Sequence, residues 1–253
     1  MELKEYRFDE VTINFDKKRI PLSGAQRKKR QGNFRYYGAQ GVIDHIDDFI
    51  FDGTYLLIAE DGENLKSKKQ NIAQVVEGQF WVNNHAHIVQ GNELCNTRYL
   101  CYLLNSMDLS GYVTGSAQPK LSQANLNAVT LFLPSITVQE RIVESLYLFD
   151  KKIAVNQKIN DNLYEMVNAY YTSLFKESDC EMTTVGNYAE RIYSGGTPMT
   201  SNAAYWNGTF GWFSSGETRN RFVISTEKTI TQAGIDNSST KLATKYDIVM
   251  ASA

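Results

Sequence analysis

The most regular pattern of apolar and polar positions in the chain lies between residues 137 and 175. This stretch contains neither Pro nor Gly, and its core positions recur at alternating spacings of four and three. The period is that of a coiled-coil seam, and it predicts one continuous helix about 58 Å long at about 1.5 Å per residue. The residues of this seam are Ile142, Leu146, Phe149, Ile153, Asn156, Asn160, Leu163, Val167, Tyr170 and Leu174.

The start of this helix is expected at Thr137, because Thr137 and Glu140 have the spacing of a capping box. An apolar stripe of this kind is often plain packing. Asn156 and Asn160 nevertheless occupy core positions near the middle, and a buried Asn lowers stability while it fixes register. The pattern therefore predicts a rigid spacer that holds two globular lobes apart and binds a partner helix along the seam.

Shorter patterns before the long helix predict a mixed lobe, mostly strand with a helix or two. Residues 42–62 have the pattern of strand, turn and strand, with Asp52-Gly53 as the hairpin turn. Helical spacing marks residues 97–107, and residues 63–70 and 115–122 are expected to form loops. Further strands are expected at residues 72–76, 80–82, 86–89 and 129–133, and residues 1–16 alternate weakly enough to open a sheet.

A second lobe is expected after the helix, where Gly, Ser, Thr and aromatic residues become frequent. Residues 52–59 resemble residues 244–251 with a shifted register, which indicates that this lobe is an incomplete repeat of the first and ends in or just after a buried strand. The predicted fold is α+β: a mostly β domain at residues 1–135, a spacer helix at 136–178 and a partial second domain at 179–253.

Bulk composition narrows the class of protein. The 253 residues are 42% hydrophobic, which is enough for a real core, and the formal net charge of −2 gives no global basic signature. Three Cys without a C-x-x-C favour free thiols in a reducing compartment over disulfides or a zinc site. Neither a signal peptide nor a run of 18 apolar residues is visible, so a soluble, cytoplasmic protein with no membrane contact is expected.

Positive charge is instead concentrated in residues 17–35, which contain no acidic residue. This segment is either a solvated surface loop or a set of contacts to the phosphates of DNA, where Lys and Arg release counterions. Its cationic residues are Lys17, Lys18, Arg19, Arg27, Lys28, Lys29, Arg30 and Arg35.

Aromatic, amide and imidazole side chains supply candidates for base recognition. Gln pairs bidentately with adenine, and the aromatic residues beside Gln40 add contact area. Asn83 and Asn84 are candidates as well, although a plain turn explains them equally well. The full candidate set is Tyr36, Tyr37, Gln40, Asn83, Asn84, His85, Gln118 and Lys120.

Motifs for catalysis are lacking in the sequence. There is no G-x-x-x-x-G-K-[ST], no G-x-G-x-x-G, and no Asn-Pro-Pro or Asp-Pro-Pro run of the kind that amino-methyltransferases use. His85 and His87 would face the same way on a strand, but no third metal ligand is evident. Asp61, Glu63 and Lys66 faintly resemble a nuclease set, although turn chemistry explains them. We therefore expect recognition rather than catalysis, with no catalytic residue and no metal.

The order of these segments resembles the specificity subunit of type I restriction-modification systems. Residues 36–41 and 51–62 look like the core of a target recognition domain. Residues 115–122, 131–134 and 139–143 are similar to the family's passage into its conserved long helix, and residues 193–212 resemble the opening of another recognition domain.

This resemblance implies that each recognition domain reads half of a bipartite site through the major groove of double-stranded DNA. Two long helices would pack antiparallel and set the gap between half-sites, about 17 base pairs for a 58 Å rod. Methylation would belong to separate modification subunits that use S-adenosylmethionine, and cleavage to a restriction subunit that uses ATP and Mg²⁺. The chain itself would need no cofactor.

One departure leaves alternatives open. A full specificity subunit has two recognition domains and two long helices, whereas this chain has one of each and the start of another domain. It could be a truncated product, a fragment from a recombining locus, or a half-subunit that forms a homodimer along the seam and reads a palindromic site. Two other functions stay open: the recognition part of a fused restriction enzyme, and a non-reading scaffold or inhibitor that only binds modification subunits.

Overall fold

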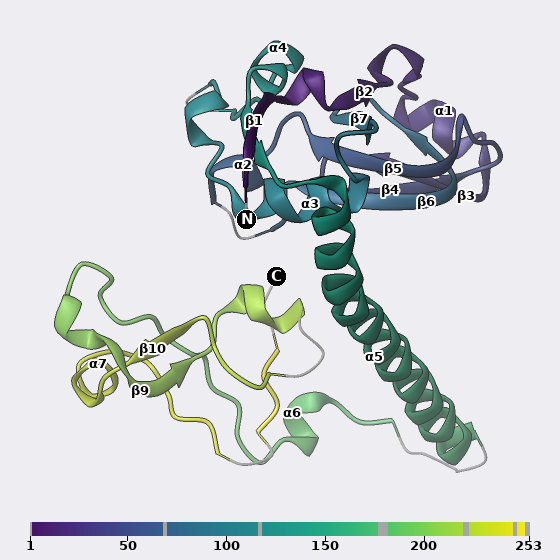
Figure 1. The fold of residues 1–253 in the computed structure, drawn as a ribbon. Coiled ribbons are helices and arrows are strands. Elements are labelled where there is room, and N and C mark those ends of the chain that lie inside the picture. The colour runs from purple at the N-terminus through teal and green to yellow at the C-terminus, as the bar shows by residue number, and fades with distance from the viewer. Residues whose placement is uncertain are drawn as a thin grey trace. The chain divides into compact units, whose positions relative to one another are not determined.

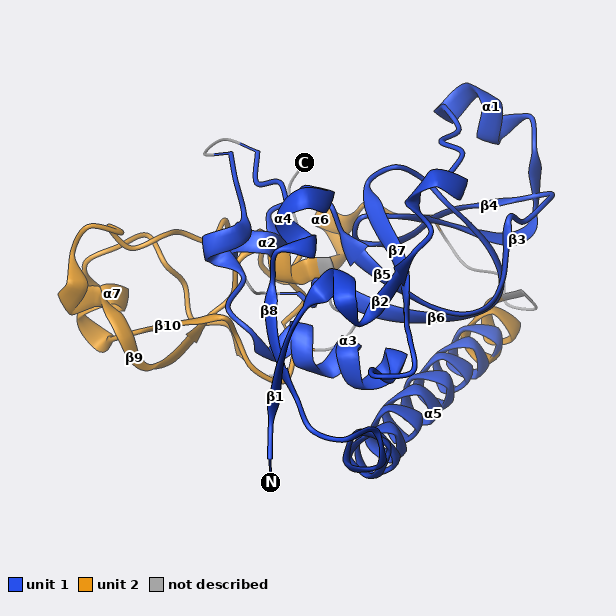
Figure 2. Ribbon diagram, turned by 45° about the horizontal axis from the view of Figure 1, so that its top comes forward, with its two compact units in different colours: residues 1–169 blue, residues 170–253 orange. Residues whose placement is uncertain are grey.

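The structure is a computed structural model, and it describes residues 2–67, 70–115, 118–176, 182–219, 223–244 and 247–250. The chain divides into two compact units, residues 1–169 and residues 170–253 (Figure 2). Each unit is described by itself below. The first holds the sheet domain and most of the long helix, and the second begins within the last turns of that helix.

A six-stranded sheet forms the body of the first unit (Figure 1). Neighbouring strands are antiparallel except β3 and β6, which are parallel. The order across the sheet is β2 (Thr12–Asn14), β7 (Ala86–Gly91), β5 (Phe51–Ala59), β6 (Ala73–Val82), β3 (Gln31–Gly38) and β4 (Gly41–Ile46). A separate antiparallel pair joins β1 (Lys4–Arg7) to β8 (Thr130–Leu133), so the two ends of the domain lie together. The α+β class is confirmed.

Gly53 and Gly78 form a corner within the β5–β6 ladder. They lie opposite each other and have φ values of 131° and 81°, a region that residues with a Cβ rarely adopt. The predicted hairpin turn at Asp52-Gly53 is therefore wrong, because this glycine lies inside β5. Because the ladder continues through this corner, the two strands predicted at 72–76 and 80–82 are parts of one strand, β6.

The connections of β6 require this corner. β6 ends beside the start of β5, whereas β7 begins beside the end of β5, and only residues 83–85 join β6 to β7. A flat ladder would separate those two points by about 30 Å at about 3.3 Å per residue, which three residues cannot span. The sheet must therefore fold back on itself, and the turns at its ends are brought together.

The described residues form three apolar clusters, the smallest of which contains Tyr36, Ile46 and Trp81. On the concave side the rings of Phe51 and Phe80 stack at 5.4 Å, with Tyr55 edge-on to both. On the other side, α3 (Thr97–Ser106) packs Leu100 and Leu104 against the sheet, as expected from the helical spacing of residues 97–107. Asn96 caps this helix by accepting from the amides of residues 98 and 99.

Two segments expected as loops contain short helices: η2 (Asp16–Lys18) and α1 (Gly24–Lys28) lie in or at the start of the basic segment, and α2 (Asn64–Ser67) lies within residues 63–70. Three further short helices are η1 (Phe8–Glu10), η3 (Ser110–Tyr112) and α4 (Gln123–Asn127). The basic segment is therefore ordered into η2, α1 and the first half of β3, rather than forming an open loop.

The long helix, α5 (Ile136–Lys176), is continuous over 41 residues, about 62 Å at about 1.5 Å per residue. It leaves the sheet domain as a single rod (Figure 1). The long helix predicted from the heptad pattern is confirmed. Its predicted start is wrong, because the Ser135 carbonyl already accepts the amides of Val138 and Gln139, which places Thr137 inside the first turn.

The second unit is built around a short antiparallel pair, β9 (Trp206–Trp212) and β10 (Lys228–Ile230). The other elements are α6 (Val185–Tyr188), η4 (Ala203–Tyr205), η5 (Ser215–Arg219) and α7 (Gln232–Asp236). Glu217 holds it together by accepting from the amides of Ser214 and Glu227. The expected strand at 244–251 is not formed by residues 247–250, and residues 245–246 and 251 lie outside the described residues.

Among the described residues, no helix is long and apolar enough to cross a bilayer. Cys95 and Cys101 are buried free thiols, as expected, and burial raises the pKa of Cys95 to about 12. Cys180 lies outside the described residues.

Candidate nucleic-acid interface

The arginines of the basic segment are bound by acceptors of their own domain. Carboxylates form ion pairs with Arg19, Arg27 and Arg30, which offset their positive charges, and the contact of these three with DNA phosphates stays a prediction. Arg35 is half-buried and donates to a backbone carbonyl, and its contact with DNA stays a prediction. The contacts are Arg19 with Asp16 and Glu60 (3.4 and 3.0 Å), Arg27 with Asp44 (2.9 Å), Arg30 with Asp47 and Asp48 (2.8 and 3.4 Å), and Arg35 with the Glu77 carbonyl (2.6 Å).

The lysines of the same segment behave differently. Lys17, Lys18, Lys28 and Lys29 are exposed. Lys18 lies 5.3 Å from the centre of the Phe15 ring, and within the described part of the chain none of the four forms an ion pair. Their charges therefore face solvent unneutralised, which is what phosphate contact requires.

Tyr36 and Tyr37 lie in the core rather than on the surface, with 0% and 4% of their area exposed. The Tyr36 hydroxyl accepts from the amide of Leu22 at 2.8 Å, and the Tyr37 ring packs edge-on against Phe80. Asn83 is also buried, and its side-chain oxygen accepts from the amide of His85. This burial contradicts the prediction that these three side chains contact bases.

Five other candidates meet where the folded sheet brings its turns together, and we call them the turn cluster: Gln40, Asn84, His85, Gln118 and Lys120. Gln40, Asn84 and His85 lie in the β3–β4 and β6–β7 turns, and Gln118 and Lys120 lie in the 118–122 loop. The Glu60 amide donates to the His85 carbonyl (2.9 Å), and the Leu121 amide donates to the Glu60 carbonyl (2.8 Å). The Gln40 amide nitrogen lies 3.4 Å from where a Cβ on Gly62 would stand. All five are exposed, so their contact with bases stays a prediction.

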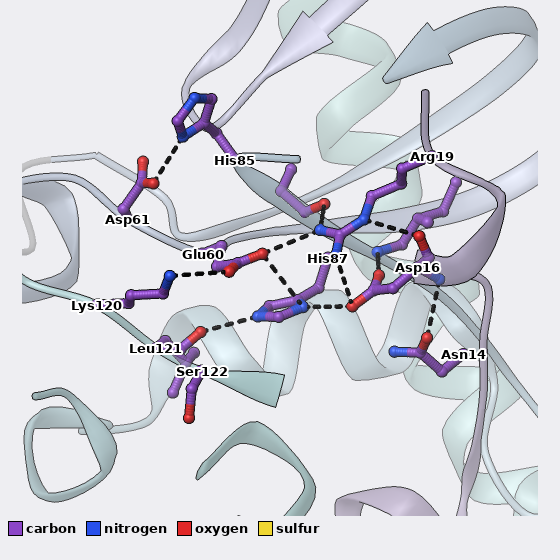
Figure 3. Close-up of polar contacts among 12 residues, drawn as sticks. Asn14, Asp16, Arg19, Glu60, Asp61, His85, His87, Lys120, Leu121 and Ser122 are labelled. Atoms are coloured by element: carbon purple, nitrogen blue, oxygen red, sulfur yellow. Dashed lines mark hydrogen bonds and ion pairs between the residues drawn. The ribbon is translucent and has the colours of Figure 1, made fainter. Parts of the chain in front are cut away.

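A buried network of charges supports the turn cluster from behind (Figure 3). His87 is 1% exposed; its Nδ1 lies 2.6 Å from Asp16 Oδ2 and its Nε2 lies 2.8 Å from the Leu121 carbonyl. Glu60 bridges Arg19 at 3.0 Å to Lys120 at 3.3 Å. The network thus ties η2, the end of β5, β7 and the 118–122 loop to one another.

Electrostatics in this network favour an ionised Asp16. Burial raises the pKa of Asp16, but hydrogen bonds from His87 and from the Ile88 amide, with the charges of His87 and Arg19, outweigh burial and lower the pKa overall. The buried, ionised carboxylate of Asp16 is stable only while these hydrogen-bond donors and positive charges are in place. The position of the 118–122 loop therefore depends on this pair.

His85 and His87 do not form the metal site considered for them. His87 is buried against Asp16, whereas His85 is exposed and its Nδ1 lies 2.7 Å from Asp61 Oδ2 (Figure 3). Within the described ranges, no group of three His, Cys, Asp or Glu side chains is placed to hold a metal ion.

The joint between the sheet domain and α5 is centred on Gln139, which is 0% exposed. Its side-chain oxygen accepts from the Asn96 amide at 2.9 Å, and its nitrogen donates to the carbonyls of Leu94 and Pro134, both at 2.9 Å. About three turns further along, the Tyr102 hydroxyl donates to Asp150 at 2.5 Å. The helix is therefore fixed to the domain by a polar lock as well as by packing.

Beyond this joint, the seam of α5 is exposed rather than buried. Seam side chains from Leu146 to Leu174 are exposed, including Phe149 at 65% and Leu163 at 53%. Leu148, Val155, Ile159 and Met166 are exposed on a neighbouring face. An apolar surface of this length indicates a helical partner.

Comparison with known proteins decides the family. The model of the type I restriction modification DNA specificity domain matches residues 2–165, which include the whole sheet domain and most of α5. This chain belongs to that family. The resemblance read from the sequence is thereby confirmed.

Relatives of this specificity-domain chain come from two bacteria. It is 35% identical over 138 residues to a Haemophilus influenzae protein named as a type I restriction enzyme specificity subunit, covering 54% of this chain and 35% of the relative. It is 30% identical over 125 residues to the EcoprrI specificity subunit of Escherichia coli, covering 49% of this chain and 30% of the relative. The chain thus spans about a third of the length of these curated relatives.

Among solved structures, the chain is similar in fold to the type I restriction-modification S subunit of M. genitalium. The TM-score is 0.60 at 12% identity, and the match covers 92% of this chain and 63% of that one. At this identity the likeness shows the shared fold.

Two residues with important positions in this specificity-domain chain had gone unrecognised in the sequence. Gln139 continues the heptad seam by one step before Ile142, so a polar residue at a core position was the available signal. Asp16, by contrast, comes from a segment far from His87 in the chain, and only the fold brings the two together.

Proposed function

We propose that this chain is a DNA-recognition subunit of a type I restriction-modification system, which reads one half of a bipartite site and binds modification subunits through α5. The family match over residues 2–165 carries the proposal. The sheet domain exposes lysines and a set of amide and imidazole side chains, which are the two kinds of group that DNA reading needs for contact with phosphates and with base edges.

The division of labour in such a system leaves the chemistry to other chains. Modification subunits using S-adenosylmethionine methylate the DNA, and a restriction subunit using ATP and Mg²⁺ cleaves it. The present chain contributes position and sequence choice in the cytoplasm, without a catalytic residue of its own. The lock around Gln139 supports this role, because it fixes the angle at which the turn cluster is presented relative to the rod.

Exposed lysines give the sharpest test. We expect a change in salt dependence when four lysines, Lys17, Lys18, Lys28 and Lys29, are replaced together by Ala. The slope of log K against log salt concentration for binding to a DNA duplex should become shallower by about 3 to 4, since each phosphate contact contributes about 0.9 to the slope. Binding is measured by fluorescence anisotropy over a series of salt concentrations. Lys4, Lys151, Lys152 and Lys158, all exposed, replaced together by Ala provide a control with the same charge change away from the segment.

An unchanged slope in the first variant, or an equal change in the control, would remove the basic segment from the DNA contact. A scaffold that binds only modification subunits is the second candidate, and the bare seam of α5 favours it. That function predicts co-purification with modification subunits together with no measurable preference for any DNA sequence.

A further inference from the structure

The main chain at His85 is fixed on both sides, although the His85 side chain is 51% exposed. Its amide donates to the side-chain oxygen of Asn83 at 2.8 Å, and its carbonyl accepts from the Glu60 amide at 2.9 Å. Asn83 is buried, and its own amide donates to the Tyr37 carbonyl at 3.0 Å. His85 is therefore anchored to β3 through Asn83 and to the end of β5 through Glu60.

A carboxylate fixes the ring of His85 as well. Asp61 Oδ2 lies 2.7 Å from His85 Nδ1, and the Asp61 side chain is 21% exposed (Figure 3). The main chain of Asp61 also forms an antiparallel bridge with that of Lys120. The carboxylate is thus held between the β6–β7 turn and the 118–122 loop, and it sets the direction of one imidazole of the turn cluster.

The contact with Asp61 also selects the ring nitrogen that carries the proton. A carboxylate only accepts hydrogen bonds, so the hydrogen of this contact stays on Nδ1 of His85. In the neutral ring, Nε2 then carries a lone pair on the side away from Asp61. Within the part of the chain that the structure describes, Nε2 has no hydrogen-bond partner. The pair therefore presents one hydrogen-bond acceptor in a fixed direction.

Folding stability gives little reason for this pair. A contact between two partly exposed side chains contributes little to the free energy of unfolding. A carboxylate on a surface that contacts DNA also repels the phosphates. Orientation of His85 is the role that the hydrogen bond of Asp61 supports, since the bond fixes both the ring and its tautomer.

We propose that Asp61 is a positioning residue for His85, and that Nε2 of His85 accepts a hydrogen bond from the exocyclic amino group of a base in the major groove. This inference rests on the proposed function. The same place in the groove holds an amino group in adenine and an oxygen in guanine, and likewise an amino group in cytosine and an oxygen in thymine. His85 in this tautomer therefore distinguishes adenine from guanine, or cytosine from thymine, at one position of the half-site.

Selection of bound duplexes from a randomised DNA pool measures this choice. The full chain is mixed with the pool at about pH 8, and base frequencies at each position of the bound duplexes are compared between wild type and Asp61→Asn. An Asn amide can accept from Nδ1 or donate to it, so both tautomers of the ring become available. Discrimination between adenine and guanine, or between cytosine and thymine, should fall about fivefold at one position and persist at the others.

Two further substitutions separate orientation of the ring from loss of charge. Glu63→Gln makes the same change of charge at an exposed carboxylate two residues away, and it should leave the preference at every position as in the wild type. His85→Ala should abolish the discrimination that Asp61→Asn weakens. Adding Asp61→Asn to the His85→Ala chain should change nothing further, because a residue that acts through His85 has no effect once that ring is removed.

Three results would contradict these expectations. An effect of Asp61→Asn that persists in the His85→Ala chain would show that Asp61 contacts a base itself, and it would overturn the proposal. A defined motif that neither Asp61→Asn nor His85→Ala alters would also overturn it, while the proposed function stands. A wild-type chain that enriches no sequence would contradict the proposed function, and this proposal with it.

Discussion

At the scale of single residues, the contact between Asp16 and His87 determines how the reading surface is held. Both ring nitrogens of His87 face acceptors, Asp16 Oδ2 at 2.6 Å and the Leu121 carbonyl at 2.8 Å. The buried His87 ring therefore joins η2, through Asp16, to the 118–122 loop, through the Leu121 carbonyl.

Replacing Asp16 tests this pair. Asp16→Asn should lower the free energy of unfolding by about 3 kcal/mol at pH 7, because it removes the buried carboxylate that contacts His87, the Ile88 amide and Arg19. Asp61→Asn is the matched control, since Asp61 contacts His85, whose side chain is 51% exposed. This substitution should lower the free energy of unfolding by less than about 1 kcal/mol. Urea unfolding of the two variants measures the difference.

Lowering the pH should remove the difference in stability between the wild type and Asp16→Asn. The pKa of Asp16 is lowered in the folded chain. Its contribution to the free energy of unfolding is therefore fully present above the pKa of the unfolded state. This contribution is lost as pH falls through the lower pKa of the folded state. The gap between wild type and Asp16→Asn should stay constant from pH 7 to about 5 and shrink below about pH 4. A gap that widens toward acid would show that Asp16 is not the ionised partner.

Residue identity alone could not separate buried from exposed candidates. Tyr36 and Tyr37 stand among cationic and amide residues in the sequence, yet both point into cores because β3 is an interior strand of the sheet. The arginines and lysines of residues 17–35 look equivalent in the sequence. Their separation into ion-paired arginines and exposed lysines depends on acidic residues in the 44–48 stretch and on Glu60, which directly follows β5.

At the scale of elements, the rod and its joint decide what the sheet domain can do. The rod was predictable because a heptad pattern without Gly or Pro is a strong local signal. The corner at Gly53 and Gly78 could not be predicted from the sequence, because an Asp-Gly pair is equally suited to a tight turn and to a bend within a ladder. The long-range pairing of β5 with β6 and β7 determines which of the two forms.

The joint yields its own prediction. Gln139→Leu should destabilise the chain by about 2 to 3 kcal/mol, because it leaves the Asn96 amide and two carbonyls buried without partners. Amide hydrogen exchange should rise in the first turns of α5 and at Asn96. Glu140→Ala, at the exposed neighbouring residue, should change stability by less than about 0.5 kcal/mol and leave exchange at the joint as it was. Equal exchange in both variants would show that Gln139 does not lock the helix.

At the scale of the whole molecule, a folded sheet that carries the turn cluster is joined through Gln139 to one end of a 41-residue helix. The family, the α+β class and the long helix could all be recognised in the sequence, because each depends on local pattern or on motif order. The turn cluster could not, because its members come together only through the corner in the sheet. The second unit, residues 170–253, adds a small two-stranded sheet.

The most direct test of DNA recognition is the methylation pattern of DNA from cells that express this chain together with the modification subunit encoded beside it. Sequencing of the methylated bases should show one defined bipartite motif. Replacing Gln40 and Asn84 by Ala should relax or abolish that motif while co-purification with the modification subunit persists. Methylation at no defined sequence, from a complex that nevertheless assembles, would contradict DNA reading by this chain.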